Sequence, residues 1–425
     1  MKRYVNPPRP AWEGLIRRQG VDYAGIRPRV EAILQAVEQE GDAALQRLMR
    51  EIDAVDAPLE VSAAEIAAAC RQVPADVQTA FCTAKSHIEA FHQAQRPREI
   101  TVETAPGVVC VQRPVPIASV GLYVPGGSAP LFSTVLMLAV PAALAGCRQR
   151  ILCTPCRKDG SVAPEVLFAA SVCGVDRIFR IGGAQAIAAM AFGTQTVPRV
   201  GKIFGPGNPY VTLAKQLVSG RCTAIDMPAG PSEVMVLADR STPPAFAAAD
   251  LLSQAEHGAD SMAVLACTEE AYAEAVLQEV ERQKRSLPRD SQVEGALSHS
   301  FAVVFPTREA LLDFAEAFAP EHLIIAVAEP EELARRVTAA GSVFIGPWSP
   351  ESAGDYASGT NHTLPTSAWA RSCSGVNLDS FLRKMTLQQL SREGLEALAP
   401  TIVTMARAEG LTAHERAVTL RMESL

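Results

Sequence analysis

The chain has few aromatic residues and no excess of positive charge. Only 5% of its 425 residues are Phe, Trp or Tyr, and the formal net charge is −7. Nucleic acids are bound by basic faces, and no run of Lys or Arg is present, so nucleic acid is not expected as a partner. With 48% hydrophobic and 20% charged residues, the composition is that of an ordinary globular protein.

Long apolar runs are also missing. The longest, from Val135 to Gly146, has about half the length of a membrane-spanning helix, and Pro141 interrupts it. The N-terminal stretch lacks the apolar segment of a secretory signal peptide. We therefore expect no membrane partner and a cytoplasmic location.

The cysteines do not indicate a disulfide framework. Ten of them are scattered along the chain, which is too few for a disulfide-stabilised protein of this length. Cys153 and Cys156 have CxxC spacing, but no second pair and no pair of histidines lies near them in sequence. We interpret them as buried structural thiols.

The chain does contain short apolar segments that alternate with helical patterns. Helical spacing covers residues 26–49 and 63–91, with boundaries at Gly41-Asp42 and at Ser62. From Val108 on, strands are predicted at 108–111, 118–123, 150–154, 177–181 and 199–204, and again at 234–238, 262–266, 301–304, 323–326 and 342–345. Helices between them predict parallel, doubly covered sheets in two α/β units. The tail after Phe381 is predicted to be helical.

Three glycine clusters each follow a predicted strand and precede or open a helix, at 121–128, 182–185 and 205–208. Ligands bind at the carboxyl ends of parallel strands, and helix N-termini favour phosphates. Any one cluster could instead be a tight turn that needs positive φ, but three at one edge favour a ligand. The fingerprint GxGxxG is absent, so these loops alone do not identify NAD.

A helix is predicted between Ser241 and Gly258. Gln254 and His257 are three residues apart, so they share one face of its last turn. An amide oxygen and an imidazole nitrogen placed there could bind one metal ion. The alternative is a histidine that caps the helix C-terminus, and this pair alone does not exclude it.

Two further segments carry candidate residues. Glu321 and His322 lie between a predicted helix and a strand, where a carboxylate and an imidazole suit proton transfer, although they could also be a surface pair. Residues 354–366 are polar and are predicted to be a functional loop or a turn held by its own side chains. Four of the seven histidines, at 257, 322, 362 and 414, fall in such segments, which indicates a site.

In this order, the segments resemble the histidinol dehydrogenases. The similarity runs from about residue 20 to the C-terminus, with Thr360 where proline is frequent and Asn377 where serine is common. It is carried by Gly-Leu-Tyr123-Val-Pro-Gly-Gly-Ser, Gly-Gly-Ala-Gln185, Gly-Pro-Gly-Asn208, Gly-Pro-Ser232-Glu, Gln254-Ala-Glu-His257, Pro-Glu321-His322, Gly-Asp355-Tyr-Ala-Ser-Gly-Thr-Asn-His362 and Glu409-Gly-Leu-Thr-Ala-His414.

The resemblance implies a role for each matched position. Zinc, one ion per subunit, would be bound by Gln254, His257, Asp355 and His414. NAD would contact Tyr123, Gln185 and Asn208, and Glu321 and His322 would be the acid–base pair. The substrate would be held by Ser232, His322 and Glu409 together with the zinc ligands Gln254, His257, Asp355 and His414. Glu409 and His414 would reach the neighbouring subunit's site, which implies a homodimer with shared active sites.

The implied fold is α/β, with two incomplete Rossmann-like parallel-sheet domains, a short N-terminal arm and a helical C-terminal extension. Residues 1–17 would form the arm. Residues 18–122 with 232–375 would form the first α/β domain, with most of the zinc and catalytic residues. Residues 123–231 would form the second, NAD-binding domain, and residues 376–425 the dimerisation extension.

The implied reaction is the oxidation of L-histidinol by two NAD, through L-histidinaldehyde, to L-histidine, the final step of histidine biosynthesis. One alternative is an NAD-dependent dehydrogenase of a non-imidazole diol on the same scaffold. Another is a non-catalytic zinc- or nucleotide-binding protein, which the intact Glu321-His322 pair disfavours. A shell that includes glutamine differs from tetrahedral structural zinc, so manganese or cobalt is an alternative metal.

Overall fold

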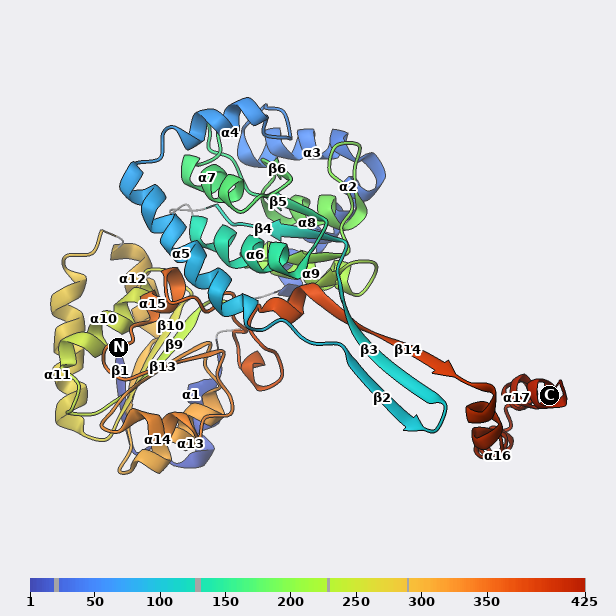
Figure 1. Ribbon diagram of the computed structural model, residues 1–425. Helices are drawn as coiled ribbons and strands as arrows, with labels where there is room; N and C mark the ends of the chain where they lie inside the picture. The colour runs from blue at the N-terminus through green and yellow to red at the C-terminus, as the bar shows by residue number, and fades with distance from the viewer. Residues whose placement is uncertain (19–22, 127–130, 228–229, 289, 425) are drawn as a thin grey trace. The chain divides into compact units, whose positions relative to one another are not determined.

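The computed structural model describes residues 1–18, 23–126, 131–227, 230–288 and 290–424. The chain divides into two compact units, residues 1–95 with 117–380 and residues 96–116 with 381–425. The first unit contains two parallel sheets with their helices, and the second contains a three-stranded antiparallel sheet and two helices (Figure 1). In the described residues, every helix is too short or too polar to cross a membrane.

The larger sheet of the first unit has six parallel strands, in the order β1 (Lys2–Val5), β11 (Phe301–Val304), β10 (Met262–Cys267), β9 (Glu233–Ala238), β12 (His322–Ala326) and β13 (Ser342–Ile345). Alternate residues of β9 and β10 enter two separate cores. One core contains α10 (Pro244–Ala255), α11 (Glu270–Lys284) and α12 (Asp290–His299). The other contains α1 (Arg9–Ile16), α13 (Arg308–Phe318) and α14 (Pro330–Ala334). Continuous apolar runs are typical of strands covered on both faces.

The smaller sheet has five parallel strands, in the order β6 (Arg177–Phe179), β5 (Gln149–Cys153), β4 (Ser119–Tyr123), β7 (Lys202–Phe204) and β8 (Ala224–Ile225). Its connections are α6 (Phe132–Ala145), α7 (Pro164–Val172), α8 (Gly183–Phe192) and α9 (Pro209–Ser219). The strands predicted between residues 118 and 204 are therefore present, within a few residues of their predicted ends.

The N-terminal helices pack on this smaller sheet's helices, which differs from the predicted grouping of residues 18–122 with 232–375. They are α2 (Tyr23–Glu40), α3 (Asp42–Leu48), a π-helical turn (Met49–Asp53), α4 (Ala63–Cys70) and α5 (Ala75–Gln93). Val30 and Leu45 share a core with Ile187 of α8. Sequence periodicity shows which face of a helix is buried, but not which sheet buries it. Ser62 caps α4 with a capping box, at the predicted boundary.

The segment predicted as an N-terminal arm is built into the larger sheet. Strand β1 pairs with the edge strand β11. Trp12 of α1 lies edge-on to Phe305 and Phe314, with ring centroids 5.4 and 5.2 Å apart. Residues 1–16 are therefore part of a sheet domain in this structure.

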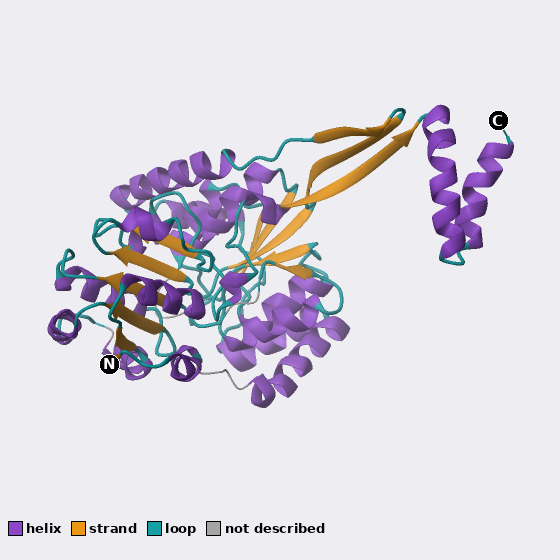
Figure 2. Cartoon of the chain, turned by 90° about the horizontal axis from the view of Figure 1, so that it is seen from below, coloured by secondary structure: helices purple, strands orange, loops and turns teal. Residues whose placement is uncertain are grey.

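The second unit contains β2 (Ile100–Ala105), β3 (Val108–Pro116) and β14 (Leu382–Leu390), with β3 in the centre. Helices α16 (Arg392–Ala408) and α17 (Thr412–Glu423) follow β14 and lie side by side (Figure 2). One prediction was wrong here, and the helical tail is confirmed except for its first segment. Residues 108–111 belong to an antiparallel, half-exposed strand rather than a buried parallel one. The tail begins with strand β14, which pairs with β3. This strand was not predicted because Leu382, Met385 and Leu387 match helical and strand spacing about equally well.

Candidate functional site

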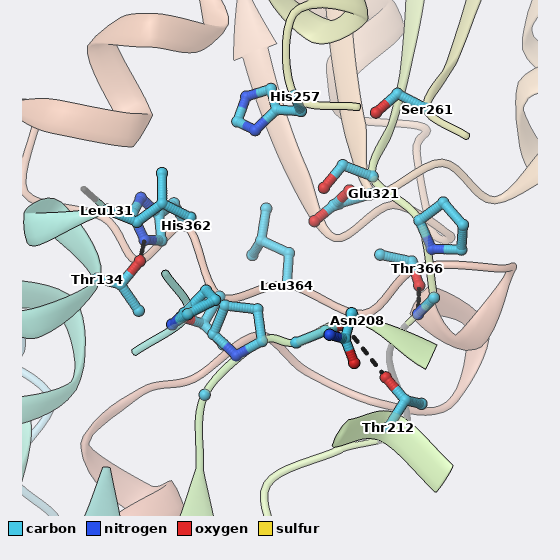
Figure 3. A pocket seen from close by; sticks show the side chains of 18 of the residues that line it. Leu131, Thr134, Asn208, Thr212, His257, Ser261, Glu321, His362, Leu364 and Thr366 are labelled. Atoms are coloured by element: carbon cyan, nitrogen blue, oxygen red, sulfur yellow. Dashed lines mark hydrogen bonds between the residues drawn. The ribbon is translucent and has the colours of Figure 1, made fainter. Parts of the chain in front are cut away.

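A cavity of about 320 Å³ lies in the first unit, between segments that come from its two sheets (Figure 3). The smaller sheet contributes the turn at residues 205–208, which follows the carboxyl end of β7, as predicted. The larger sheet contributes Ser232, His257, Ser261, Glu321 and His322. These residues precede or begin strands β9, β10 and β12. The larger sheet therefore lines the cavity with the amino ends of its strands, which the order of the strands alone does not predict.

Glu321 and His322 stand at the start of β12, next to β9. In the sheet register, His322 lies opposite Val234. The side chains of Glu321 and His322 therefore lie beside the main chain of Glu233, the residue before Val234. The Glu233 N–H donates to Glu321 Oε2 at 2.9 Å, and the Glu233 carbonyl lies 3.3 Å from His322 Nδ1. Because a carbonyl only accepts, Nδ1 carries the proton. Nε2 is then a free acceptor with no hydrogen-bond partner among the described residues.

Burial sets the protonation of this pair. Desolvation lowers the pKa of His322 to about 3, which keeps the imidazole neutral. Desolvation also raises the pKa of Glu321 well above its ordinary value, although the Glu233 N–H opposes this. A neutral imidazole and a carboxyl group of raised basicity are suited to general acid–base catalysis.

Gln254 and His257 lie at the end of α10, as predicted. The helix ends at Ala255, and the His257 N–H donates to the Gln254 carbonyl at 3.2 Å. Gln254 is fully buried, and neither atom of its amide has a hydrogen-bond partner among the described residues. The His257 side chain is 41% exposed, and its Nε2 lies 3.8 Å from Asp355 Oδ2.

Asp355 lies on a helix, not in the predicted loop. The helix α15 (Glu351–Tyr356) begins after Pro350 and presents Asp355 to the cavity. Asp355 Oδ1 lies 3.9 Å from His322 Nε2, so this carboxyl group stands between the two histidines. Burial raises the pKa of Asp355 to about 7. The short helix was not predicted because residues 354–366 are polar and lack an apolar helical pattern.

Glu351 is a site residue that the sequence did not reveal. It lies one turn before Asp355 and is buried, with neither carboxylate oxygen hydrogen-bonded among the described residues. Its Oε1 lies 3.6 Å from His322 Nδ1. Ligand atoms of His257, Glu351 and Asp355 all fall within 4.8 Å of one another. The only sequence signal was the i, i+4 spacing from Asp355, which has little meaning until the helix is known.

These donors fit a divalent cation. An amide oxygen, an imidazole and carboxylates are ligands of zinc and similar metals. A buried unsatisfied polar group such as the Gln254 amide costs about 1–3 kcal/mol, and coordination of its oxygen would remove that cost. Glu409 and His414 lie in the second unit, at the end of α16 and in the first turn of α17, and both are exposed.

The opposite wall contains the turn at residues 205–208, with Asn208 as the N-cap of α9 (Figure 3). The Asn208 side chain accepts from the Val211 N–H at 3.1 Å. Gly205 has φ +120°, and a Cβ there would lie 2.0 Å from the Tyr123 carbonyl oxygen, so only glycine fits.

A buried ion pair supports this turn. Lys215 Nζ donates to the Gly205 carbonyl at 2.7 Å and pairs with Asp226. The Asp226 carboxylate accepts from the Gly205 N–H at 2.7 Å. Both polar groups of the Gly205 main chain are thereby fixed by charged side chains, which makes the turn rigid.

The other two positions predicted to contact NAD are buried. The Tyr123 hydroxyl accepts from the Gly183 N–H at 3.1 Å, and Gln185 lies in the first turn of α8. Neither lines the cavity, whereas Asn208 does. In this structure Tyr123 therefore supports the Gly182-Gly183 turn. The first glycine cluster falls partly on residues 127–130, outside the described residues.

His362 connects α15 to the smaller sheet's domain. Its Nδ1–H donates to the Asp355 carbonyl at 3.0 Å, and its Nε2 lies 3.2 Å from the Thr134 hydroxyl at the start of α6. Burial lowers its pKa to about 4, so the ring is neutral. His362 also lines the cavity, and its two contacts join the helix that carries Asp355 to the start of α6.

Two parallel sheets around one cavity, with a glycine turn on one wall and an acid–base pair beside cation ligands on the other, define an α/β enzyme. The family model described as histidinol dehydrogenase matches residues 16–422. The chain therefore belongs to the histidinol dehydrogenase family and is an oxidoreductase that acts on a CH–OH group.

Individual relatives agree with this assignment along the whole chain. A histidinol dehydrogenase of Bacteroides fragilis (strain YCH46) is 51% identical, covering 100% of both chains. One of Escherichia coli (strain K12) is 52% identical over 94% of this chain and 92% of its own. The crystal structure of histidinol dehydrogenase from Elizabethkingia anophelis has a TM-score of 0.97 at 46% identity, covering 100% of this chain and 98% of that one. The resemblance and the α/β fold class predicted from the sequence are confirmed.

Proposed function

We propose that this chain oxidises L-histidinol through L-histidinaldehyde to L-histidine with two NAD, as the final step of histidine biosynthesis. The observation that carries the proposal is the neutral His322 in the cavity wall, whose free Nε2 lies near Asp355 and whose Nδ1 lies near Glu321. Family membership and the names of the relatives support the substrate and the cofactor.

His322 is proposed as the base in both oxidation steps. Its Nδ1–H is held by the Glu233 carbonyl, so Nε2 accepts the hydroxyl proton of the alcohol and later that of the aldehyde hydrate. NAD, when bound, supplies the acceptor for both hydrides. Asn208 would contact it directly, and Tyr123 and Gln185 belong to the same proposed subsite.

Glu321 is proposed to activate water in the second step. Its carboxyl group is buried beside His322, and burial makes its carboxylate a stronger base than an exposed one. Water attack on the aldehyde gives the hydrate, from which the second hydride leaves. Neither step needs a cysteine thiol, and the buried Cys153 has a pKa raised by burial, which argues against a nucleophilic role.

Gln254, His257 and Asp355 are proposed to hold zinc, one ion per subunit, with His414 as the fourth ligand. Zinc, when bound, supplies a positive centre that orients the polar groups of the substrate. Ser232 in the cavity wall, and Glu409, would hold the substrate itself. Because Glu409 and His414 lie in the second unit, we propose a homodimer in which each subunit completes its neighbour's site. A cytoplasmic location is proposed as well.

The experiment compares L-histidinol with leucinol, an amino alcohol without imidazole, at saturating NAD. Rapid NADH formation from L-histidinol alone supports the proposal. Similar rates with both substrates would favour a dehydrogenase of broader specificity, and binding of NAD without any NADH formation would favour a non-catalytic protein.

A further inference from the structure

Arg18, just after α1, reaches a buried carboxylate in the larger sheet. Its Nε and Nη2 donate to the two carboxylate oxygens of Glu233, both at 2.8 Å. Nη1 donates to the Ile16 carbonyl at 2.9 Å, and Nη2 also donates to the Phe318 carbonyl at 2.7 Å. The guanidinium carbon lies 3.7 Å from the centre of the Phe318 ring. This planar, two-pronged geometry is specific to arginine.

Glu233 is the residue whose main chain holds the catalytic pair. Its N–H donates to Glu321, and its carbonyl accepts from His322. It is also the first residue of β9, where the strand enters the sheet. Its side chain bonds to Arg18 while its main chain bonds to Glu321 and His322, so one residue joins the ion pair to the acid–base pair.

Because the ion pair is buried, loss of either partner has a large effect on the other. The Glu233 side chain is 1% exposed and that of Arg18 is 15% exposed. A carboxylate in such surroundings needs a charged partner, because removal of the partner leaves an uncompensated charge. Without Arg18, Glu233 must rearrange, and the start of β9 moves with it. Displacement of a catalytic group by about 1 Å is enough to slow a reaction markedly.

We infer that Arg18 and Glu233 are a positioning pair for Glu321 and His322, so that the N-terminal segment, residues 1–18, belongs to the catalytic apparatus. The inference rests on the proposed roles of Glu321 and His322. Neither Arg18 nor Glu233 lines the cavity, so they act through the main chain of β9 and not by contact with substrate.

The test compares Arg18→Met, Arg18→Lys, Glu233→Gln and the double variant Arg18→Met/Glu233→Gln. Arg3→Met is the matched control, because Arg3 lies on β1 of the same segment and its ion-pair partners among the described residues are the exposed carboxylates of Glu270 and Glu274. Arg18→Met is expected to lower kcat about tenfold or more, with little change in KM for NAD or in zinc content. Arg18→Lys should recover part of the loss. The double variant should lose less than the product of the two single losses, because glutamine needs no cation.

A second measurement is independent of turnover. Hydrogen exchange at the Glu233 amide, which donates to Glu321, is expected to be faster in Arg18→Met than in wild type or Arg3→Met. Unchanged kcat together with unchanged exchange in folded Arg18→Met would overturn the inference. If wild type forms no NADH, the proposed function fails, and faster exchange in Arg18→Met would still show that the pair positions Glu233.

Discussion

At the scale of single residues, the site depends on how each polar group is paired. His322 has one nitrogen satisfied by a main-chain carbonyl and the other free among the described residues. Glu321 receives a main-chain N–H and remains buried. The tautomer and the basicity of the pair therefore follow from Glu233 and from burial.

Glu321→Gln should separate the two oxidation steps. The amide retains an oxygen for the Glu233 N–H but cannot accept a proton. The first hydride transfer should stay close to the wild-type rate, whereas oxidation of the aldehyde should fall by about 10²–10⁴-fold. Single-turnover NADH formation from L-histidinol and from L-histidinaldehyde measures both. An equal loss in the two steps would show that the division of roles is wrong.

His257→Ala should remove the metal. His257 is the imidazole donor of the described cluster, and its loss leaves Gln254 and the carboxylates. Loss of a direct ligand weakens binding strongly, so purified variant should contain far less than one zinc per subunit. Elemental analysis of wild type and variant checks this. Retention of one equivalent would contradict the ligand assignment.

At the scale of elements, the glycine turn depends on charged groups beneath it. Lys215 and Asp226 fix both polar groups of Gly205, and Gly205 itself contacts the Tyr123 carbonyl too closely for any side chain. The turn and α9 therefore form one wall of the cavity, and the end of β4 supports the turn from behind.

Lys215→Met should weaken NAD binding more than histidinol binding. Removal of the cation leaves Asp226 buried and unpaired, which should destabilise the fold by about 3–5 kcal/mol. The double variant Lys215→Met/Asp226→Asn is the control and should recover part of the stability. NAD affinity and the unfolding midpoint are measured together. Wild-type NAD affinity in folded Lys215→Met would contradict a role of this pair in the cofactor wall.

Much of the element pattern could be predicted, because strands buried on both faces leave continuous apolar runs. Residues 301–304 and 342–345 are strands with the predicted ends. Strand β14 was missed because its apolar spacing is ambiguous, and α15 because it is short and polar. Spacing alone predicted only the Gln254–His257 pair. Asp355 lies near His257 and His322 only in the folded chain, because the three residues are far apart in sequence. Local sequence patterns do not predict such contacts, so Asp355 was predicted from the family resemblance alone.

At the scale of the whole molecule, the candidate site residues are divided between two units. Gln254, His257 and Asp355 belong to the first unit, and Glu409 and His414 belong to the second. The three-stranded sheet of the second unit includes residues 96–116, so this unit is larger than the predicted extension 376–425. In the proposed homodimer, Glu409 and His414 of one subunit would complete the site that the first unit of the other subunit begins.

Complementation between two inactive variants tests the shared site. His414→Ala and Glu321→Gln homodimers should each be impaired in the full reaction. If His414 serves the neighbouring subunit, a heterodimer has one intact site, and a mixed, refolded sample should regain about a quarter of wild-type activity. L-histidine formation per total protein is the measurement, because Glu321→Gln alone should still form the first NADH. Absence of any recovery in confirmed heterodimers would show that His414 serves its own subunit.

The central claim is that this cavity carries out two oxidations on one bound substrate. The most direct measurement is the number of NADH formed per L-histidinol consumed by the wild-type enzyme at excess NAD. The account predicts two, with L-histidine as the product. One NADH, with L-histidinaldehyde released, would contradict it.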